Sequence, residues 1–314
     1  MRREDLTHMA ELITTGEIRM DEPMKRHTTL GIGGPAEIFV RPGDREELLR
    51  LLRYAAAEKI PVQLLGSGSN CLVSDAGVSG LVISLAGTLN HLTIEGDQVV
   101  VQAGVMLGHL VRRCRAAGLA GLESLGGVPG TVGGALVMNA GAFGTEISTH
   151  LTAVNIVNHQ GRERRYARED LSFGYRSSSF EPGEIIIGGE FKFPWGQEEQ
   201  VAKASRLASR ERKTRQPLTK RSAGSVFKNP RPDLAAGWLL DEAGLKGTRI
   251  GDAQISPQHA NFFINRGSAT ADDMARLIKL AAGTIKARFK VQLELEIRTL
   301  GFPRGFWEEA GLGR

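Results

Sequence analysis

Two glycine-rich segments of the chain could hold an anionic ligand close to the backbone. The first, LLGSGSN at residues 64–70, includes the end of the apolar run VQLL. Successive backbone N–H groups in such a turn of small residues can form an anion-binding nest. Its small and polar residues are Gly66, Ser67, Gly68, Ser69 and Asn70. Considered alone, however, the pattern favours an ordinary tight turn between two strands.

The second segment, GGVPGTVGGALVMNAGAFG at residues 126–144, changes that balance. Glycine loses more conformational entropy on folding than any other residue, so this density indicates backbone that passes close to a large, flat or charged group. Pro129 stiffens the turn, and Thr131 and Asn139 are its polar side chains. The apolar residues 135–138 are not typical of loop filler. The two segments therefore indicate a ligand-binding cradle.

Several other chemistries are excluded by their missing motifs. The chain has no Gly-Lys dipeptide and no GxSxG, which excludes a P-loop and a nucleophile elbow. Its seven histidines form no HxH or HxxxH pair, and Cys71 and Cys114 form no CxxC pair, so we expect neither a metal site nor a disulfide scaffold. GIGGPA at residues 31–36 imitates a dinucleotide fingerprint. It precedes a strand instead of following one, which argues against a Rossmann domain.

Length and composition indicate a globular protein of two or three domains. Hydrophobic residues make up 41% of the 314 positions and charged residues 24%, as in ordinary folded domains. The N-terminus is charged and no apolar run approaches the roughly 20 residues that cross a bilayer. We therefore expect a cytoplasmic protein with no membrane contact. The net charge is only +5, and the basic run at 203–221 lacks interleaved aromatic residues, so we expect no nucleic-acid partner.

The segments that position the glycine-rich loops are predicted to be a mixture of helices and short strands. Apolar spacing predicts helices near 6–13, 44–55, 106–117, 233–243 and 271–289, and a basic helix that ends near 213. Asp44 with Glu47, and Thr270 with Asp273, form capping-box patterns at two of these helix starts. Strands are expected at 36–40, 62–65, 81–85, 99–103, 153–157, 184–188 and 291–299.

Two glycine-rich loops on such a strand-rich domain resemble the flavin cradle of the vanillyl-alcohol-oxidase type. Over about residues 24–301 the chain also resembles the UDP-N-acetylenolpyruvoylglucosamine reductases (the MurB family). The motifs that carry this resemblance are TTLGIGGPA, LLGSGSN, GGVPGTVGGALVMNAGAFG, YRSSSF, AGSVFKNP and LELEIR, in this order. Only a short stretch and one helix separate YRSSSF from AGSVFKNP. The chain is therefore similar to the shorter, second type, which lacks an inserted loop with a substrate-clamping tyrosine.

The resemblance implies an α+β fold. An FAD-binding domain of the vanillyl-alcohol-oxidase/PCMH type would comprise two α+β lobes, residues 1–61 and 62–205, of which the second carries the glycine-rich cradle. Residues 206–301 would form an α+β UDP-sugar-binding domain that the C-terminal strand closes, and residues 302–314 would be a tail.

The reaction that the resemblance implies is the FAD-dependent reduction of UDP-N-acetylglucosamine enolpyruvate to UDP-N-acetylmuramate, in peptidoglycan precursor synthesis. FAD would be bound non-covalently, and NADPH would be the co-substrate. After hydride transfer the carbon beside the carboxylate must be protonated. That step requires an acid near the carbon, positive charge near the carboxylate and exclusion of water. The alternative is another flavin oxidoreductase of the same fold that acts on a different substrate.

The family match assigns three catalytic residues: Arg176 in YRSSSF, Ser225 in AGSVFKNP and Glu296 in LELEIR. Arg176 would hold the substrate carboxylate, Ser225 would donate the proton, and Glu296 would stabilise the enol intermediate. On local sequence alone the three are more typical of a surface ion pair, a turn cap and a solvated strand face. Glu294 lies on the same predicted strand face as Glu296 and is the obvious alternative.

The remaining residues implied by the match would bind cofactor or substrate. The cofactor-binding residues are Gly66, Ser67, Gly68, Ser69, Asn70, Pro129, Gly130, Thr131, Gly133, Asn139, Gly141 and Arg212. The substrate-binding residues are Tyr175, Arg215, Lys228 and Asn229. Gln254 and His259, in GDAQISPQHANFF, belong to the substrate domain without an assigned role.

Overall fold

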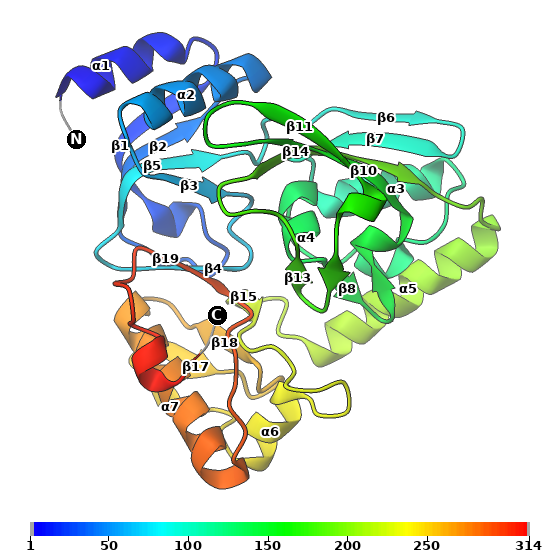
Figure 1. The fold of residues 1–314 in the computed structure, drawn as a ribbon. Helices are drawn as coiled ribbons and strands as arrows, with labels where there is room; N and C mark the ends of the chain where they lie inside the picture. The colour runs from blue at the N-terminus through cyan, green and yellow to red at the C-terminus, as the bar shows by residue number, and fades with distance from the viewer. Residues whose placement is uncertain (1–2, 313–314) are drawn as a thin grey trace. The chain divides into compact units, whose positions relative to one another are not determined.

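A computed structural model describes residues 3–312, and the chain divides into two compact units. The first unit contains residues up to 20, 38–67 and 80–211, and the second contains 21–37, 68–79 and the residues from 212 onward. Neither unit is therefore one continuous segment. Figure 1 labels most of the helices and strands of both units. The domain boundaries expected after residues 61, 205 and 301 stay a prediction.

A four-stranded sheet near the N-terminus packs against two helices. Its strands are, in spatial order, β1 (Glu17–Pro23), β2 (Pro35–Arg41), β5 (Val78–Ser84) and β3 (Val62–Leu65), and β3 runs parallel to β5. The helices are α1 (Arg3–Leu12) and α2 (Arg45–Ala57). Leu48, Leu51 and Leu52 of α2 share one buried cluster with Ile38 and Val40 of β2. The helical spacing of the apolar residues predicts this buried stripe.

A five-stranded antiparallel sheet dominates the rest of the first unit. Its strands are, in spatial order, β11 (Glu163–Ala167), β10 (Leu151–Val157), β14 (Ile185–Lys192), β7 (Gln98–Gln102) and β6 (Leu92–Glu95). Val99 and Val101 of β7 are buried while Val100 is exposed, as the pleat of a strand requires. The helices α3 (Leu107–Ala116) and α4 (Val132–Val137) pack on the buried face (Figure 1). The helix α5 (Glu198–Arg215) follows β14.

The second unit is built on an antiparallel sheet and two helices. The strands are, in spatial order, β15 (Arg221–Ser225), β18 (Phe262–Asn265), β17 (Ala253–Ile255) and β16 (Arg249–Ile250), and the helices are α6 (Ala236–Glu242) and α7 (Ala271–Phe289). Both hydrogen bonds of the predicted capping box between Thr270 and Asp273 are present at the start of α7. A separate pair of parallel strands joins β4 (Cys71–Val73) to β19 (Arg298–Leu300).

The remaining elements are short. Two small hairpins pair β8 (Gly141–Ala142) with β9 (Thr145–Glu146), and β12 (Phe173–Gly174) with β13 (Ser177–Ser178). Single 3-10 turns lie at Met24–Arg26, Glu123–Leu125, Ile147–His150, Arg168–Asp170 and Glu308–Ala310. Within residues 3–312, no helix is both long enough and apolar enough to span a membrane.

The structure confirms the α+β class and most of the predicted elements, with two differences. First, the glycine-rich segment 126–144 is not all loop, because residues 132–137 form α4 and Thr131 caps its start. Second, the strand predicted over 291–299 is wrong for most of its length. Only β19 is a strand, and Leu295 makes an isolated bridge with Phe227. The alternation predicted the burial of Leu293, Leu295 and Ile297 correctly. Before β19, however, this segment pairs with a neighbouring backbone only around the single bridge of Leu295 with Phe227.

Candidate active site

The two glycine-rich segments meet in the first unit. A Cβ atom at Gly66 would lie 2.8 Å from the Oγ1 atom of Thr131, so these two predicted cofactor residues are neighbours. Thr131 is buried and accepts a hydrogen bond from the N–H of Gly134 at 3.3 Å, which starts α4. A Cβ atom at Gly133 would lie 2.9 Å from the Cβ atom of Ala103. The glycines therefore let the loop and helix pack closely on their own chain.

The segment 66–70 passes from the first unit to the second after Ser67. Gly68 has a φ of +64°, and a Cβ atom there would lie 1.9 Å from the carbonyl oxygen of His27. The carbonyl of Gly68 accepts a hydrogen bond from the N–H of Thr29 at 3.1 Å. Position 68 therefore requires glycine for reasons internal to the protein. This agrees with the tight turn that the segment 64–70 favours when it is considered alone, and it leaves the binding of a ligand there a prediction.

Asn70 joins the same segment to the backbone beside Glu296. Its Nδ2 group donates to the carbonyl oxygen of Glu296 at 3.1 Å, and its own carbonyl accepts from the N–H of Arg298 at 2.8 Å. The parallel pairing of β4 with β19 continues from this contact. A predicted cofactor residue and a predicted catalytic residue are thus neighbours in the second unit.

Ser225 and Glu296 lie on adjacent segments of the second unit. Ser225 is the last residue of β15, where it pairs with Phe262 of β18. The next residue, Val226, accepts a hydrogen bond from the N–H of Glu296 at 2.8 Å. Both Ser225 and Glu296 are partly exposed. The backbone segments that carry this hydroxyl and this carboxylate are therefore adjacent.

The structure distinguishes Glu296 from Glu294. The exposed carboxylate of Glu294 lies 3.3 Å from the Nζ atom of Lys228, and the N–H of Lys228 donates to the carbonyl of Glu294 at 2.9 Å. The predicted substrate residue Lys228 therefore has a partner within the chain. Asn229, another predicted substrate residue, accepts a hydrogen bond at 3.1 Å from the N–H of Ala236 at the start of α6.

Arg176 lies at the turn of the β12–β13 hairpin in the first unit. Its φ of +53° is uncommon for a residue with a side chain, and such strained positions cluster at functional sites. Its Nη2 group donates to the carbonyl of Gly141 at 3.2 Å, which joins two predicted site residues. Its guanidinium carbon lies 5.0 Å from the ring centre of the exposed Tyr175. The guanidinium is thus held beside an aromatic ring.

Asn139 binds the backbone of the β12–β13 hairpin. The buried side chain donates through Nδ2 to the carbonyl of Gly174 at 3.0 Å and to the carboxylate of Glu146 at 2.8 Å. Its Oδ1 atom is buried without a hydrogen-bond partner, and its φ is +41°. A buried acceptor without a donor is costly, so this atom suits an N–H or O–H group of a ligand.

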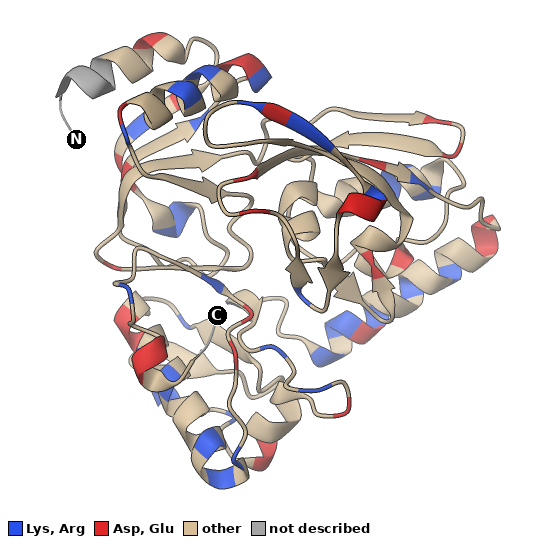
Figure 2. Cartoon of the chain, in the orientation of Figure 1, with Lys and Arg blue, Asp and Glu red and all other residues tan. Residues whose placement is uncertain are grey.

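The C-terminal end of α5 carries Arg212 and Arg215, and Figure 2 shows Lys and Arg along this helix. Arg215 is exposed, whereas Arg212 is partly buried. Burial lowers the pKa of Arg212, and its Nε atom is buried without a hydrogen-bond partner. An unpaired buried guanidinium nitrogen suits an anion. Gln258, which sequence reasoning missed, donates to the carbonyls of Thr214 and Gln216 at 3.0 and 3.1 Å and so holds this helix end.

The two residues that the sequence left without a role have structural contacts. Gln254 donates through Nε2 to the carbonyl of Gly247 at 3.1 Å. The Nδ1 atom of His259 accepts from the N–H of Asn261 at 3.3 Å, and burial, with Lys246 nearby, lowers the pKa of His259. Asn261 was also missed, because a single asparagine in a segment without a predicted helix or strand carries no sequence signal.

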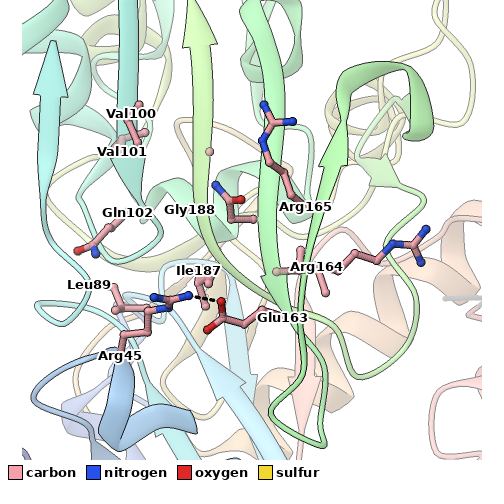
Figure 3. A pocket seen from close by; sticks show the side chains of 13 residues that line it. Arg45, Leu89, Val100, Val101, Gln102, Glu163, Arg164, Arg165, Ile187 and Gly188 are labelled. Carbon is pink, nitrogen blue, oxygen red and sulfur yellow. Dashed lines mark hydrogen bonds and ion pairs between the residues drawn. The ribbon is translucent and has the colours of Figure 1, made fainter. Parts of the chain in front are cut away.

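A shallow groove of about 380 Å³ lies elsewhere on the first unit, over the sheet face opposite α3 and α4. Figure 3 shows Arg45 of α2 paired with Glu163 of β11 at one end, and Arg164 and Arg165 along it. Arg165 in turn pairs with Glu190. The groove contains none of the predicted site residues, and its paired charges are exposed. Nor do the residues that the structure describes include a cluster of three or more His, Cys, Asp or Glu that could hold a metal ion.

Two family models match separate parts of this chain. Residues 36–166 match the family model of an FAD binding domain, and residues 216–300 match that of the UDP-N-acetylenolpyruvoylglucosamine reductase C-terminal domain. The UDP-N-acetylenolpyruvoylglucosamine reductase 2 of Symbiobacterium thermophilum is 44% identical over 288 residues, which cover 91% of this chain and 93% of that protein. The reductase of Syntrophus aciditrophicus is 41% identical over 292 residues, with 91% and 93% covered.

A solved structure supports the same relationship. The crystal structure of the UDP-N-acetylenolpyruvylglucosamine reductase of Thermus caldophilus has a TM-score of 0.78 and 39% sequence identity, and the match covers 91% of this chain and 98% of that one. The predicted flavin-binding fold is confirmed by this match and by the FAD-domain model. The chain belongs to the UDP-N-acetylenolpyruvoylglucosamine reductase family.

Proposed function

We propose that this protein uses NADPH to reduce the enolpyruvyl group of UDP-N-acetylglucosamine enolpyruvate, which gives UDP-N-acetylmuramate for peptidoglycan precursor synthesis. The family supports this reaction, and so does the match of residues 36–166 to an FAD binding domain. The observation that carries the proposal is the hydrogen bond from the Glu296 N–H to Val226, the residue after Ser225, at 2.8 Å. It places an acid and a hydroxyl on adjacent segments.

The residues present fit a non-covalently bound FAD. The unpaired buried Nε of Arg212 suits a phosphate, and the unpaired buried Oδ1 of Asn139 suits a ring N–H or a hydroxyl. Bound FAD supplies the ability to take a hydride from a nicotinamide and pass it to carbon. The residues proposed to hold it are Gly66, Ser67, Gly68, Ser69, Asn70, Pro129, Gly130, Thr131, Gly133, Asn139, Gly141 and Arg212.

Charged and polar side chains of this chain are proposed to bind the substrate. Arg176 offers a planar guanidinium to the carboxylate of the enolpyruvyl group, and its contacts with Gly141 and Tyr175 orient it. Arg215, Lys228 and Asn229 are proposed to bind the UDP-sugar, with Tyr175 beside Arg176. The ammonium group of Lys228 also forms an ion pair with the carboxylate of Glu294.

Proton transfer is proposed to start at the hydroxyl of Ser225. A serine is a weak acid, so it must lie close to the carbon that it protonates and be polarised by its surroundings. Glu296 is proposed to stabilise the enol form of the carboxylate, and the backbone bond to Val226 fixes its distance from Ser225. We also propose a cytoplasmic location, since Cys71 and Cys114 are both free, as is usual in a reducing compartment.

Separating the two half-reactions tests this proposal. Under anaerobic conditions NADPH should bleach the flavin absorbance of the purified protein, and the enolpyruvyl UDP-sugar should restore it. UDP-N-acetylglucosamine, which lacks the enolpyruvyl group, should not restore it. In Ser225→Ala the bleaching should remain while the recovery slows by roughly 100- to 10,000-fold, the usual cost of losing a general acid. Absorbance that the enolpyruvyl sugar fails to restore would favour a flavin oxidoreductase with another substrate.

A further inference from the structure

Asn261 makes an unusual pair of hydrogen bonds to the segment after Ser225. Its Oδ1 atom accepts from the N–H of Phe227 at 3.0 Å, and its Nδ2 group donates to the carbonyl of the same residue at 2.8 Å. Its backbone carbonyl accepts from the N–H of Val226 at 2.9 Å. Both partners are buried, with 3% of Asn261 and 0% of Phe227 exposed. One asparagine thus satisfies every polar backbone group that Phe227 has.

The pairing of the neighbouring segment explains why Phe227 needs this partner. On one side, Val226 accepts from the N–H of Glu296 and Lys228 donates to the carbonyl of Glu294. In antiparallel pairing, backbone groups of alternate residues point to opposite sides. Phe227, which bridges Leu295, therefore turns its own N–H and carbonyl away from the Glu296 segment. On that side no strand pairs with Phe227, and the side chain of Asn261 provides the hydrogen bonds that a neighbouring strand would provide.

Loss of this side chain would leave two buried backbone groups without partners. Buried N–H and carbonyl groups are nearly always paired in folded proteins, because an unpaired group loses its hydration and gains nothing. The segment would then shift to find new partners. Ser225 directly precedes the segment Val226–Phe227. The carbonyl of Val226, in the same segment, accepts the hydrogen bond from the N–H of Glu296. A shift of Phe227 would therefore move both proposed catalytic residues.

We infer that Asn261 is a positioning residue that fixes the distance and orientation of Ser225 relative to Glu296. This inference rests on the roles of Ser225 and Glu296 in the proposed function. Asn261 contacts neither side chain in the hydrogen bonds described, and it acts through the backbone of Val226 and Phe227. Asn261 should therefore affect the proton-transfer step and not the binding of NADPH.

Asn261→Asp is the sharpest single change. The carboxylate keeps the size of the amide and still accepts from the Phe227 N–H, but it cannot donate to the Phe227 carbonyl. Misplacement of a reacting group by about 1 Å can cost roughly 100-fold in rate. We therefore expect flavin recovery by the enolpyruvyl UDP-sugar to slow by about 10- to 100-fold. Flavin bleaching by NADPH and the KM of the sugar should change little.

Asn265→Asp is the matched control. Asn265 ends strand β18, which begins directly after Asn261, and it is similarly buried, with 4% exposed. Its Nδ2 group donates to the carbonyl of Leu30 at 3.0 Å, and its Oδ1 atom accepts from the N–H groups of Gly267 and Ala269. The substitution removes the same kind of donor, but the side-chain hydrogen bonds of Asn265 involve none of Ser225, Phe227 and Glu296. It should lower thermal stability and leave the ratio of the two half-reaction rates unchanged.

A double variant separates positioning from general destabilisation. If Asn261 acts through Ser225, then Asn261→Asp should slow recovery much less in a Ser225→Ala background than in the wild type. The same fold-loss in both backgrounds would overturn the inference, and so would equal slowing of bleaching and recovery. If Asn261→Asp does not fold, Asn261→Gln carries the same expectation, since it keeps both amide groups but displaces them by one methylene. Should Ser225→Ala itself slow both half-reactions equally, the failure lies in the proposed function.

Discussion

Glu47 offers a prediction whose size follows from the structure. Its carboxylate is buried at the start of α2. One oxygen accepts from the N–H groups of Thr14 and Thr15 at 2.8 and 2.6 Å and from both hydroxyls at 2.9 Å. The other accepts from the N–H groups of Gly16 and Gly43 at 3.1 and 2.7 Å. One ionised side chain therefore joins two turns of the first unit.

These hydrogen bonds determine the sign and size of a pH effect. Burial raises the pKa of the Glu47 carboxyl, but the bonds from Gly43, Thr15 and Thr14 outweigh it and lower the pKa from 4.5 to about 2. At about 1.4 kcal/mol per pH unit, this corresponds to roughly 3 kcal/mol of stability. Because the folded pKa is the lower one, that stability is complete above pH 4.5 and is lost as the pH falls toward 2.

Glu47→Gln should remove most of this contribution at neutral pH. An amide keeps one acceptor oxygen but turns an NH₂ group toward the N–H donors of Gly16 and Gly43. We expect the free energy of unfolding at pH 7 to fall by about 3 kcal/mol, and the difference from the wild type to shrink below about 1 kcal/mol near pH 2. Denaturant unfolding measured at several pH values provides the comparison. Glu46→Gln, at the exposed neighbouring position, should change stability little. A loss that stays the same from pH 7 to pH 2 would refute the reasoning.

Three further predictions address the site. Gly68→Val should lose FAD together with thermal stability, because φ is +64° and His27 occupies the space of a side chain; stoichiometric FAD in a protein of unchanged melting temperature would contradict this. Arg215→Ala should weaken UDP-sugar binding by one to two decades, the usual loss of about 1.5–3 kcal/mol for a charge-assisted hydrogen bond, while bleaching by NADPH is retained; an unchanged KM would place Arg215 among the solvated charges. Glu296→Gln should slow flavin recovery more than Glu294→Gln, because Glu294 is exposed and paired with Lys228; the reverse order of rates would exchange their roles.

The sequence predicted the helices and several strands of the first unit, but it missed the strands β15, β16, β17 and β18 of the second unit. The helix start at Thr270 forms as its capping box requires, since both partners lie within one turn. At the other predicted capping box the side chain of Asp44 accepts from the N–H of Glu47 at 2.8 Å, but the carboxylate of Glu47 binds Thr14, Thr15, Gly16 and Gly43. Gly43 directly precedes the cap, but Thr14, Thr15 and Gly16 lie 31 to 33 residues before Glu47. A pattern of neighbouring residues contains no information about them.

The choice between Glu294 and Glu296 also depends on contacts that a local sequence pattern cannot predict. Alternation places both acids on the side opposite the buried Leu293, Leu295 and Ile297. What separates them is their partners: Lys228 pairs with Glu294, whereas Asn70 binds the carbonyl of Glu296. Both partners are remote in sequence. Family motifs selected Glu296, and periodicity alone had no means to do so.

Asparagine side chains form hydrogen bonds with backbone groups at three segments of the proposed site. Asn261 pairs with both polar groups of Phe227, Asn70 donates to the carbonyl of Glu296, and Asn139 donates to the carbonyl of Gly174, two residues before Arg176. A carboxamide carries the same donor and acceptor groups as a peptide unit, so it can replace a missing strand. The segment can then leave its sheet, and direct a side chain toward a ligand, without an unpaired buried group. The glycine-rich motifs drew attention to Asn70 and Asn139 in the sequence, whereas Asn261 has neither a charge nor a motif that would single it out.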